Sequence, residues 1–269
     1  MKEKIQFSRL KELPDLELYR GTSVARQVSR HVHWVFSLGV CEAGVGEHET
    51  KAGKYYVTPG SIVVVNVDET HSGGAAAGCV YSSRAIRIEP AFLRALLTQI
   101  GGQEQECLPL LEPVINNPDL ARRVFHLHRQ LADSSSRLEK ETTLLGILAE
   151  LYAGYSRQGL ALASLGDERA PVSRVCEYLQ TCFSENVSLE CLAGVAGLSP
   201  FHLSRVFTKE IGVPPHTYQL QVRLKKAADL IAAGKPLAET AQETGFCDQS
   251  HFHKSFKRKF GISPGQYKG

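Results

Sequence analysis

Three histidines in the first third of the chain could bind a metal ion or a small ligand through their ring nitrogens. His31 and His33 lie two positions apart in a predicted strand, so both side chains point to one face. With His71 they could supply three nitrogens to a transition metal. Histidines that border a pocket for an organic molecule, or that are hydrogen-bonded inside the domain, explain the same spacing. The spacing leaves these three interpretations open.

Aromatic and basic residues near these histidines extend the predicted site. We expect a pocket for a small organic effector to be lined by His31, His33, Trp34, Tyr56, His71, Tyr81 and Arg84, with Arg87 as a further candidate. The sequence has no glycine-rich phosphate loop, nucleophile elbow or Cys-x-x-Cys pair, and these are the motifs that would indicate catalysis. The pattern therefore predicts a sensor and not an enzyme.

The positive charge of the chain is concentrated in its last hundred residues. Residues 170–269 hold 12 Lys and Arg against 8 Asp and Glu, whereas the whole chain has a net charge of only +3. Contacts to phosphate need cations gathered on one surface. This asymmetry favours a polyanionic partner for the carboxy-terminal part of the chain.

The seven cysteines are scattered through the chain and odd in number, which argues against a disulfide framework and fits a reducing compartment. Three of them, Cys176, Cys182 and Cys191, could make the protein sensitive to oxidants, although free cysteines are usually small buried side chains. The amino end carries charges throughout and lacks the apolar segment of a signal peptide. We expect a cytoplasmic protein without a membrane partner.

The hydrophobic pattern changes from strand to helix near residue 90. Residues 19–90 contain short runs rich in Val, Ile and Tyr, separated by Gly, Pro and Asp, as is typical of a sandwich or small barrel. Helical spacing of Leu and Ile over 119–131 and 138–155 predicts apolar faces that pack on the strands, on a second copy of the chain, or on both. The predicted parts are an effector-binding barrel over 1–90, a helical dimerisation or packing segment over 91–158, a linker over 159–170 and a domain for the polyanionic partner over 171–269.

An internal repeat organises the last hundred residues. Residues 189–198 match 237–246 at an offset of 48, and after one extra residue the matches continue at an offset of 49. In each copy a short helix ends near a glycine, and a second helix follows a capping Ser199 or Asp248. This is the pattern of a helix-turn-helix unit. A helix over 214–233 joins the copies and spans about 30 Å, close to the roughly 34 Å of one DNA turn.

The repeat, the joining helix and the closing Phe-Gly-Ile-Ser-Pro-Gly-Gln-Tyr resemble the AraC/XylS family of bacterial transcription regulators over about residues 171–268. Residues 19–90 resemble that family's cupin-like effector domain more loosely, through His-Val-His-Trp, Pro-Gly-Ser and Glu-Thr-His-Ser-Gly. The resemblance implies two domains: an all-β cupin-like barrel with following helices, and an all-α domain of seven helices with two helix-turn-helix units. It implies as partners double-stranded DNA, a small-molecule effector and, for an activator, RNA polymerase. The apolar helical faces allow a second copy of the chain as a further partner through residues 119–155, with packing inside the chain as the alternative.

The cupin resemblance also bears on the histidines. A metal-dependent cupin carries a carboxylate shortly after its His-x-His pair, whereas residues 35–39 read Val-Phe-Ser-Leu-Gly and Glu42 is the first acid. We therefore predict no metal and no cofactor. A regulator that responds to a metal through His31, His33 and His71, or to oxidants through its cysteines, is the alternative, and a cupin-type enzyme is a more remote one.

The family resemblance assigns the DNA contacts by position. The residues that match base-contacting positions are Phe201, Ser204, Arg205, Gln249, Ser250, His251 and Lys254. Arg205 is suited to a bidentate contact with guanine and Gln249 to one with adenine, whereas Lys254 lacks the planar fork of the arginine that the family often has there. The expected phosphate contacts, for each of which a solvated surface role is the alternative, are Lys209, Arg223, Lys225, Lys226, Lys257, Arg258 and Lys259.

Overall fold

The computed structural model describes residues 3–103, 107–133, 136–158, 160, 162 and 168–267. The chain forms two compact units. The first comprises Met1–Asp133 and Thr143–Ala163, and the second comprises Ser134–Thr142 and Ser164–Gly269. Most of the predicted linker over 159–170 lies outside the described residues. None of the helices in the described ranges combines the length and the apolar character that a membrane span requires.

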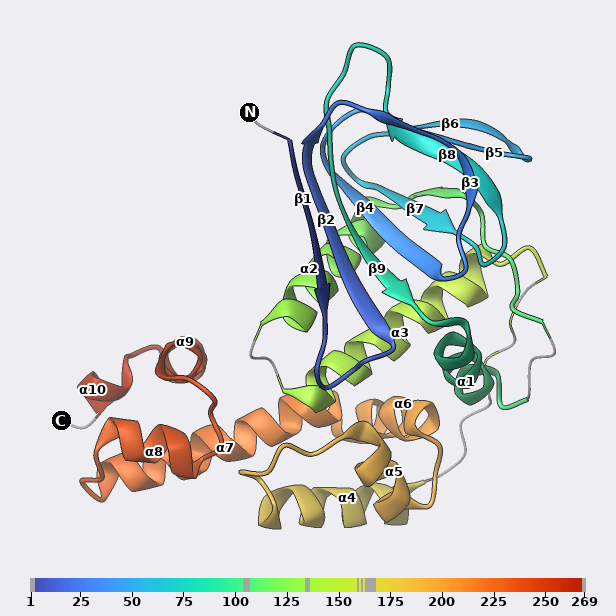
Figure 1. The fold of residues 1–269 in the computed structure, drawn as a ribbon. Coiled ribbons are helices and arrows are strands. Elements are labelled where there is room, and N and C mark those ends of the chain that lie inside the picture. Colours follow the sequence, from blue (N-terminus) through green and yellow to red (C-terminus); the bar gives the residue numbers. More distant parts are fainter. Residues whose placement is uncertain are drawn as a thin grey trace. The chain divides into compact units, whose positions relative to one another are not determined.

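The first unit is built on two antiparallel sheets (Figure 1). A six-stranded sheet has the order β1-β2-β9-β4-β7-β10, and a four-stranded sheet has the order β3-β8-β5-β6. The strands are β1 (Lys4–Arg9), β2 (Leu16–Val24), β3 (Gln27–Val32), β4 (Phe36–Gly44), β5 (Gly46–Thr50), β6 (Gly53–Val57), β7 (Ser61–Val65), β8 (Thr70–Ala75), β9 (Tyr81–Ile88) and β10 (Val114–Asn116). The predicted all-β class is confirmed. The described strands form two separate antiparallel sheets and not one closed, hydrogen-bonded barrel.

Alternating side chains of the six-stranded sheet form the core of this unit. Phe36 pairs with Ile88 and Leu38 with Ile86 across β4 and β9, and all four side chains are fully or almost fully buried. The helices of the unit are α1 (Pro90–Gly101), α2 (Pro118–Ala132) and the part of α3 (Arg137–Tyr155) that follows Thr142. Because α2 contacts β4, β7 and β9, its apolar side closes this face of the sheet.

The apolar residues of α3 are already used inside the chain. Leu144, Leu145, Leu148, Leu151 and Tyr152 are all at most 3% exposed. A second copy of the chain that docked on residues 119–155 would therefore meet exposed side chains of α2 and α3, such as Arg123 and Glu150, and not these leucines.

The sequence pattern missed three features of the first unit. The edge strand β1 has almost no buried side chain, so it lacks the alternation by which strands are recognised. Gly73 and Gly74 have the residue type that typically separates strands, but they lie within β8, where a Cβ on either residue would come within 3.0 Å of a neighbouring strand's backbone. The three-residue strand β10, inside the segment predicted as helical, adds to the edge of the sheet beside β7.

The second unit contains α4 (Arg169–Thr181), α5 (Leu189–Ala196), α6 (Pro200–Ile211), α7 (Pro215–Ala232), α8 (Leu237–Glu243), α9 (Gln249–Phe260) and α10 (Pro264–Tyr267). These are the seven helices that the resemblance implies, within residues 168–267. Helices α4, α5 and α6 pack together around fully buried leucines such as Leu179, Leu192 and Leu203. A second core joins α7, α8 and α9 through Leu224, Phe252, Phe256 and their neighbours.

Both predicted turns are confirmed in detail. Ser199 Oγ accepts a hydrogen bond from the His202 backbone N–H, and Asp248 Oδ1 accepts one from His251, so each second helix is capped as expected. Gly197 has φ 72° and Gly245 has φ 78°, which is the left-handed conformation that glycine adopts at low cost. A Cβ on Gly245 would also lie 2.3 Å from the Ser184 carbonyl oxygen, so this turn needs glycine for space as well.

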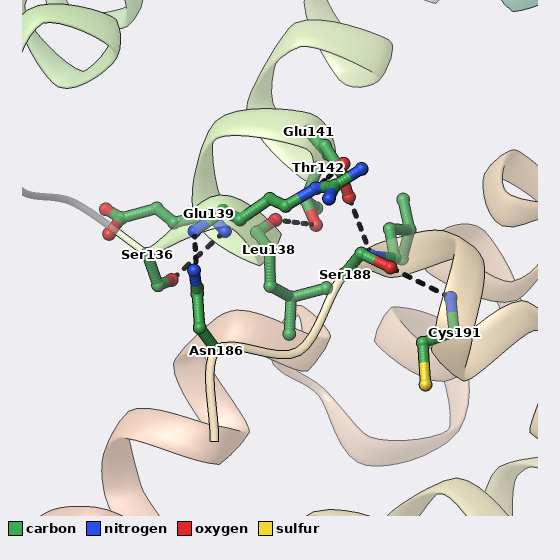
Figure 2. Close-up of polar contacts among 10 residues, drawn as sticks. Ser136, Leu138, Glu139, Glu141, Thr142, Asn186, Ser188 and Cys191 are labelled. Carbon is green, nitrogen blue, oxygen red and sulfur yellow. Dashed lines mark hydrogen bonds and ion pairs between the residues drawn. The ribbon is translucent and has the colours of Figure 1, made fainter. Parts of the chain in front are cut away.

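The first turns of α3 belong to the second unit (Figure 2). The Leu189 backbone N–H, in the first turn of α5, donates to Glu141 Oε2 at 2.7 Å, and the Arg137 backbone N–H donates to Asn186 Oδ1 at 3.4 Å. Arg137 also forms an ion pair with Glu141, and Leu138 is fully buried. A carboxylate at a helix N-terminus is favourable because it meets unpaired N–H groups and the positive end of the helix dipole. The rest of α3, from Thr143, belongs to the first unit.

Candidate effector cavity and DNA interface

A cavity of about 310 Å³ lies within the first unit, bordered by residues of both sheets. Of the predicted effector-binding residues, it is lined by His31, His33, His71, Tyr81 and Arg84. The predicted further candidate Arg87 lines it as well. The structure therefore brings together side chains that are up to 56 positions apart in the sequence.

Two of the predicted effector residues do not reach the cavity. Trp34 is 75% exposed and Tyr56 is 64% exposed, and neither lines it. Trp34 lies between β3 and β4, and Tyr56 points to the opposite face of β6 from its buried neighbour Val57. The prediction of both residues relied on aromatic type near the histidines, which does not assign the face of the strand, and neither side chain lines this cavity.

The three predicted histidines form one cluster at the cavity wall. Their ring centroids are 4.5–4.9 Å apart, and the Nε2 atoms of His31 and His33 are 2.7 Å apart. His31 and His71 are directly paired across β3 and β8, and His33 follows the end of β3. Burial lowers the pKa of His33 to about 4 and also lowers the pKa of His71, so both rings are neutral at neutral pH.

His48 is a fourth histidine of this cavity that the sequence pattern did not single out. It is 4% exposed, its ring centroid lies 5.2 Å from that of His71, and burial lowers its pKa to about 4. Its Nε2 is buried without a hydrogen-bond partner among the described residues. The alternation Gly46-Glu-His48-Glu-Thr50 was the available signal, because it places His48 on the buried face of β5.

Charged side chains of the cavity are held by acidic partners. Arg84 forms an ion pair with Glu42, and Arg87 donates from Nη1 to Glu17 Oε2 at 3.2 Å. The Arg87 guanidinium also lies 4.8 Å from the centroid of the Phe7 ring. Tyr19 and Ser83 are further lining residues that the sequence analysis missed. The cavity thus combines imidazole, guanidinium, hydroxyl and aromatic groups, which suits a small polar organic molecule with an apolar part.

The second helices of the two helix-turn-helix units, α6 and α9, present the predicted base-contacting side chains. Gln249, Ser250 and Lys254 are exposed on α9. His251 is half-buried, with its ring 5.6 Å from that of Phe246. On α6, Ser204 and Arg205 are half-exposed, and the Arg205 guanidinium lies over the Phe201 ring at 5.4 Å. A planar guanidinium stacked on a ring is oriented before it meets a base.

Two of the predicted DNA contacts need correction. Phe201 is 3% exposed, so its side chain supports the α4–α6 core and the stacked Arg205 and does not reach a base. Arg223 is 7% exposed and donates to the backbone carbonyls of Phe183 and Glu185 at 2.7 and 2.8 Å. Because both contacts lie within the folded unit, Arg223 holds the loop between α4 and α5 and is not available to phosphate.

The other predicted phosphate contacts remain on the surface. Lys209, Lys225, Lys226, Lys257, Arg258 and Lys259 are all exposed. A groove of about 870 Å³ is bordered by α4, α7 and the α9–α10 region. Its lining includes Lys225, Lys226, Lys259, Tyr218 and Tyr267, and also the acidic Glu177 and Asp229. Lysines and phenols around one groove can meet a phosphate backbone through both charge and hydrogen bonds.

Two of the three cysteines predicted as oxidant-sensitive differ in burial. Cys176 is half-buried and burial raises its pKa, which disfavours the reactive thiolate. Cys191 is exposed, and its Sγ lies 3.5 Å from the Tyr178 hydroxyl. All seven cysteines are free.

Comparison with known proteins agrees with both halves of this description. The model of the AraC-like ligand binding domain matches residues 13–148, and that of a helix-turn-helix domain matches residues 192–269. An uncharacterized HTH-type transcriptional regulator, YbfI of Bacillus subtilis (strain 168), is 31% identical over 237 residues, which cover 88% of this chain and 85% of that protein.

Two further similarities cover different shares of the chain. The HTH-type transcriptional activator RhaS of Enterobacter sp. (strain 638) is 25% identical over 242 residues, covering 87% of this chain and 85% of that one. The solved C-terminal domain of AraT, a response regulator from Geobacillus stearothermophilus, is 32% identical, with a TM-score of 0.36 over 38% of this chain and 87% of that one. The two domain models and the similarity to YbfI over most of both chains show that the chain belongs to the AraC family of helix-turn-helix transcriptional regulators.

Proposed function

We propose that this regulator binds DNA sequence-specifically through α6 and α9, and activates transcription in response to a small organic molecule held in the cavity of the first unit. The observation that carries the proposal is the pair of capped helix-turn-helix units, each with polar side chains on its second helix, joined by α7. At about 1.5 Å per residue the 18 residues of α7 span ~27 Å, close to one turn of DNA.

The base readers on this proposal are Ser204, Arg205, Gln249, Ser250, His251 and Lys254. Arg205→Ala should weaken binding to the selected site about 5- to 150-fold and binding to random duplex much less, because a bidentate guanine contact is worth about 1–3 kcal/mol of discrimination. Lys209→Ala, on the exposed end of the same helix, is the matched control. It should weaken both duplexes alike. Equal losses for Arg205→Ala on the two duplexes would remove Arg205 from the reader set.

The effector is best sought with the full chain and a thermal-shift screen against amino acids, sugars and aromatic acids. We expect one class to stabilise the protein, and Ser83→Leu, which fills the cavity wall with a larger side chain, to abolish that shift. Stabilisation that persists unchanged in Ser83→Leu would place the effector elsewhere.

Helix α3 offers a route between effector and DNA. Its first turns are fixed to the start of α5 through Glu141 and Leu189, and its remainder is part of the first unit. An effector that favours one position of α3 would therefore bias the first helix-turn-helix unit by differential affinity. Effector-dependent DNA binding that is unchanged in Glu141→Ala would contradict this route.

Activation would require a contact with RNA polymerase, and homodimerisation would use the exposed polar side of α2. In vitro transcription from a selected site tests the first. Sedimentation of the full chain with and without DNA tests the second, and a monomer in both states would exclude the dimer.

A further inference from the structure

We propose that His31, His33 and His71 together bind one divalent transition-metal ion of the zinc class at the cavity wall. This site goes beyond DNA-binding regulation and does not depend on the identity of the organic effector.

The first argument is the convergence of the ligand atoms. One ring nitrogen of each histidine lies within 4.8 Å of the other two. Three nitrogens that bind one ion at about 2.0–2.1 Å must lie about 3.3 Å from one another, so small side-chain rotations bring this set to the required spacing. The backbone is already in place, because His31 and His71 are paired across two neighbouring strands and His33 follows two residues later.

The second argument is the orientation of the rings. His31 Nδ1 lies 2.7 Å from the Ser29 carbonyl oxygen, and His71 Nδ1 lies 3.4 Å from that of Glu69. A carbonyl can only accept, so Nδ1 carries the hydrogen in each ring, and in a neutral imidazole Nε2 then carries the lone pair. Histidines that bind metals commonly donate their second N–H to a carbonyl in this way.

The hydrogen bond between His31 and His33 also fixes where the lone pairs lie. The Nε2 atoms of His31 and His33 are 2.7 Å apart and share a single hydrogen, which belongs to His33 because His31 carries its hydrogen on Nδ1. The Nε2 atoms of His31 and His71 then each carry a lone pair in the same small region. A metal ion accepts all three lone pairs after His33 moves its hydrogen to Nδ1. No net proton is released by that shift, because each imidazole stays neutral.

The donor set determines the class of ion. Three imidazoles without a carboxylate suit Zn²⁺, Co²⁺, Ni²⁺ or Cu²⁺, whereas Mg²⁺ and Ca²⁺ prefer oxygen ligands. Three protein ligands leave one position of a tetrahedral ion for water or for a donor atom of a bound molecule. His48 is not part of the group, although its ring packs beside His71.

The test is a competition titration of the chelator-stripped full chain with Zn²⁺ and a chromophoric chelator. We expect one ion per chain. His33→Gln should weaken Zn²⁺ binding at least about 100-fold, because it removes a ligand from a half-exposed position, and His31→Gln should do the same. His126→Gln, at an exposed histidine on α2, is the matched control and should bind as the unaltered chain does.

Two further readouts keep the test decisive. Co²⁺ should give the visible absorption of a tetrahedral site in the unaltered chain and not in His33→Gln, and Mg²⁺ should not compete. Circular dichroism checks that both variants fold, and if one does not, the other decides. Less than about 0.2 equivalents of tightly bound Zn²⁺ in the unaltered chain, or Zn²⁺ affinities of His33→Gln and His31→Gln equal to that of the unaltered chain, would overturn the site. DNA binding by the stripped chain would leave the regulator proposal standing in either case.

Discussion

Replacing Arg223 with methionine should destabilise the second unit while leaving its contacts to DNA phosphates unchanged. The sequence pattern assigns Arg223 to phosphate binding, but the side chain is 7% exposed and donates to two backbone carbonyls of the loop between α4 and α5. The substitution keeps much of the side-chain volume and removes both donors.

The expected loss follows from these contacts. A hydrogen bond from a charged group contributes about 1.5–3 kcal/mol net, and Arg223 makes two, at 2.7 and 2.8 Å. Gln219 Nε2 also donates to the same two carbonyls at 3.2 and 3.0 Å, so neither carbonyl is left without a donor. Burial lowers the pKa of Arg223, because the buried cation has lost its hydration. Replacing Arg223 by an uncharged residue removes this desolvation cost, which offsets part of the lost hydrogen-bond free energy. We therefore expect about 2–4 kcal/mol, a Tm shift of roughly 10 °C or more for a unit of this size.

The assay combines urea unfolding, followed by circular dichroism, with the salt dependence of binding to a random duplex. Lys225→Met is the matched control, because Lys225 is exposed on the same helix, two positions away. It should change stability by less than about 0.5 kcal/mol and lower the slope of log K against log salt by about 0.9. Arg223→Met should lower the stability by about 2–4 kcal/mol and leave the slope of log K against log salt unchanged. Unchanged stability together with a lower salt slope for Arg223→Met would refute the structural role and restore the phosphate contact.

Two other perturbations test the first turns of α3 and a buried histidine. Glu141→Ala should reduce the stability of the second unit by about 1–2 kcal/mol in urea unfolding, because the Leu189 N–H loses a carboxylate acceptor. The control Glu190→Ala changes an exposed residue in the first turn of α5 and should cost less than about 0.5 kcal/mol. Equal losses in the two variants would count against the contact. Burial lowers the pKa of His128 to about 4, below the roughly 6.5 of an unfolded imidazole, so the unfolded chain binds more protons between these values. The stability of the first unit should therefore fall as pH drops from about 6.5 to 4. In urea unfolding of His128→Gln this fall should be smaller, by roughly 2 kcal/mol or less. The same pH dependence in His128→Gln and in the unaltered chain would contradict the prediction.

Local patterns predicted the second unit well because its signals are short in range. The spacing of leucines, the left-handed glycines Gly197 and Gly245, and the caps Ser199 and Asp248 each act within one or two turns of helix. Exposure is a tertiary property, and this is where the position-by-position assignment was wrong. Phe201 and Arg223 have the expected residue types, but neighbouring helices and a loop cover them.

The cavity was predicted only in part for the same reason. His31, His33 and His71 could be grouped from their motif, and the structure does place them in one cluster. His48 comes from a strand whose pairing with β8 depends on two glycines, and no local pattern reveals that pairing. Trp34 and Tyr56 show the converse, since both are aromatic residues near the site in sequence that point to solvent.

Sequence-specific reading by two recognition helices is the central claim, and selection from a random duplex library with the full chain tests it most directly. We predict enrichment of a site with two conserved halves whose centres are about 10 base pairs apart, one helical turn, because α6 and α9 flank a helix of ~27 Å. Enrichment of a single short half-site, or no enrichment above the starting library, would contradict it.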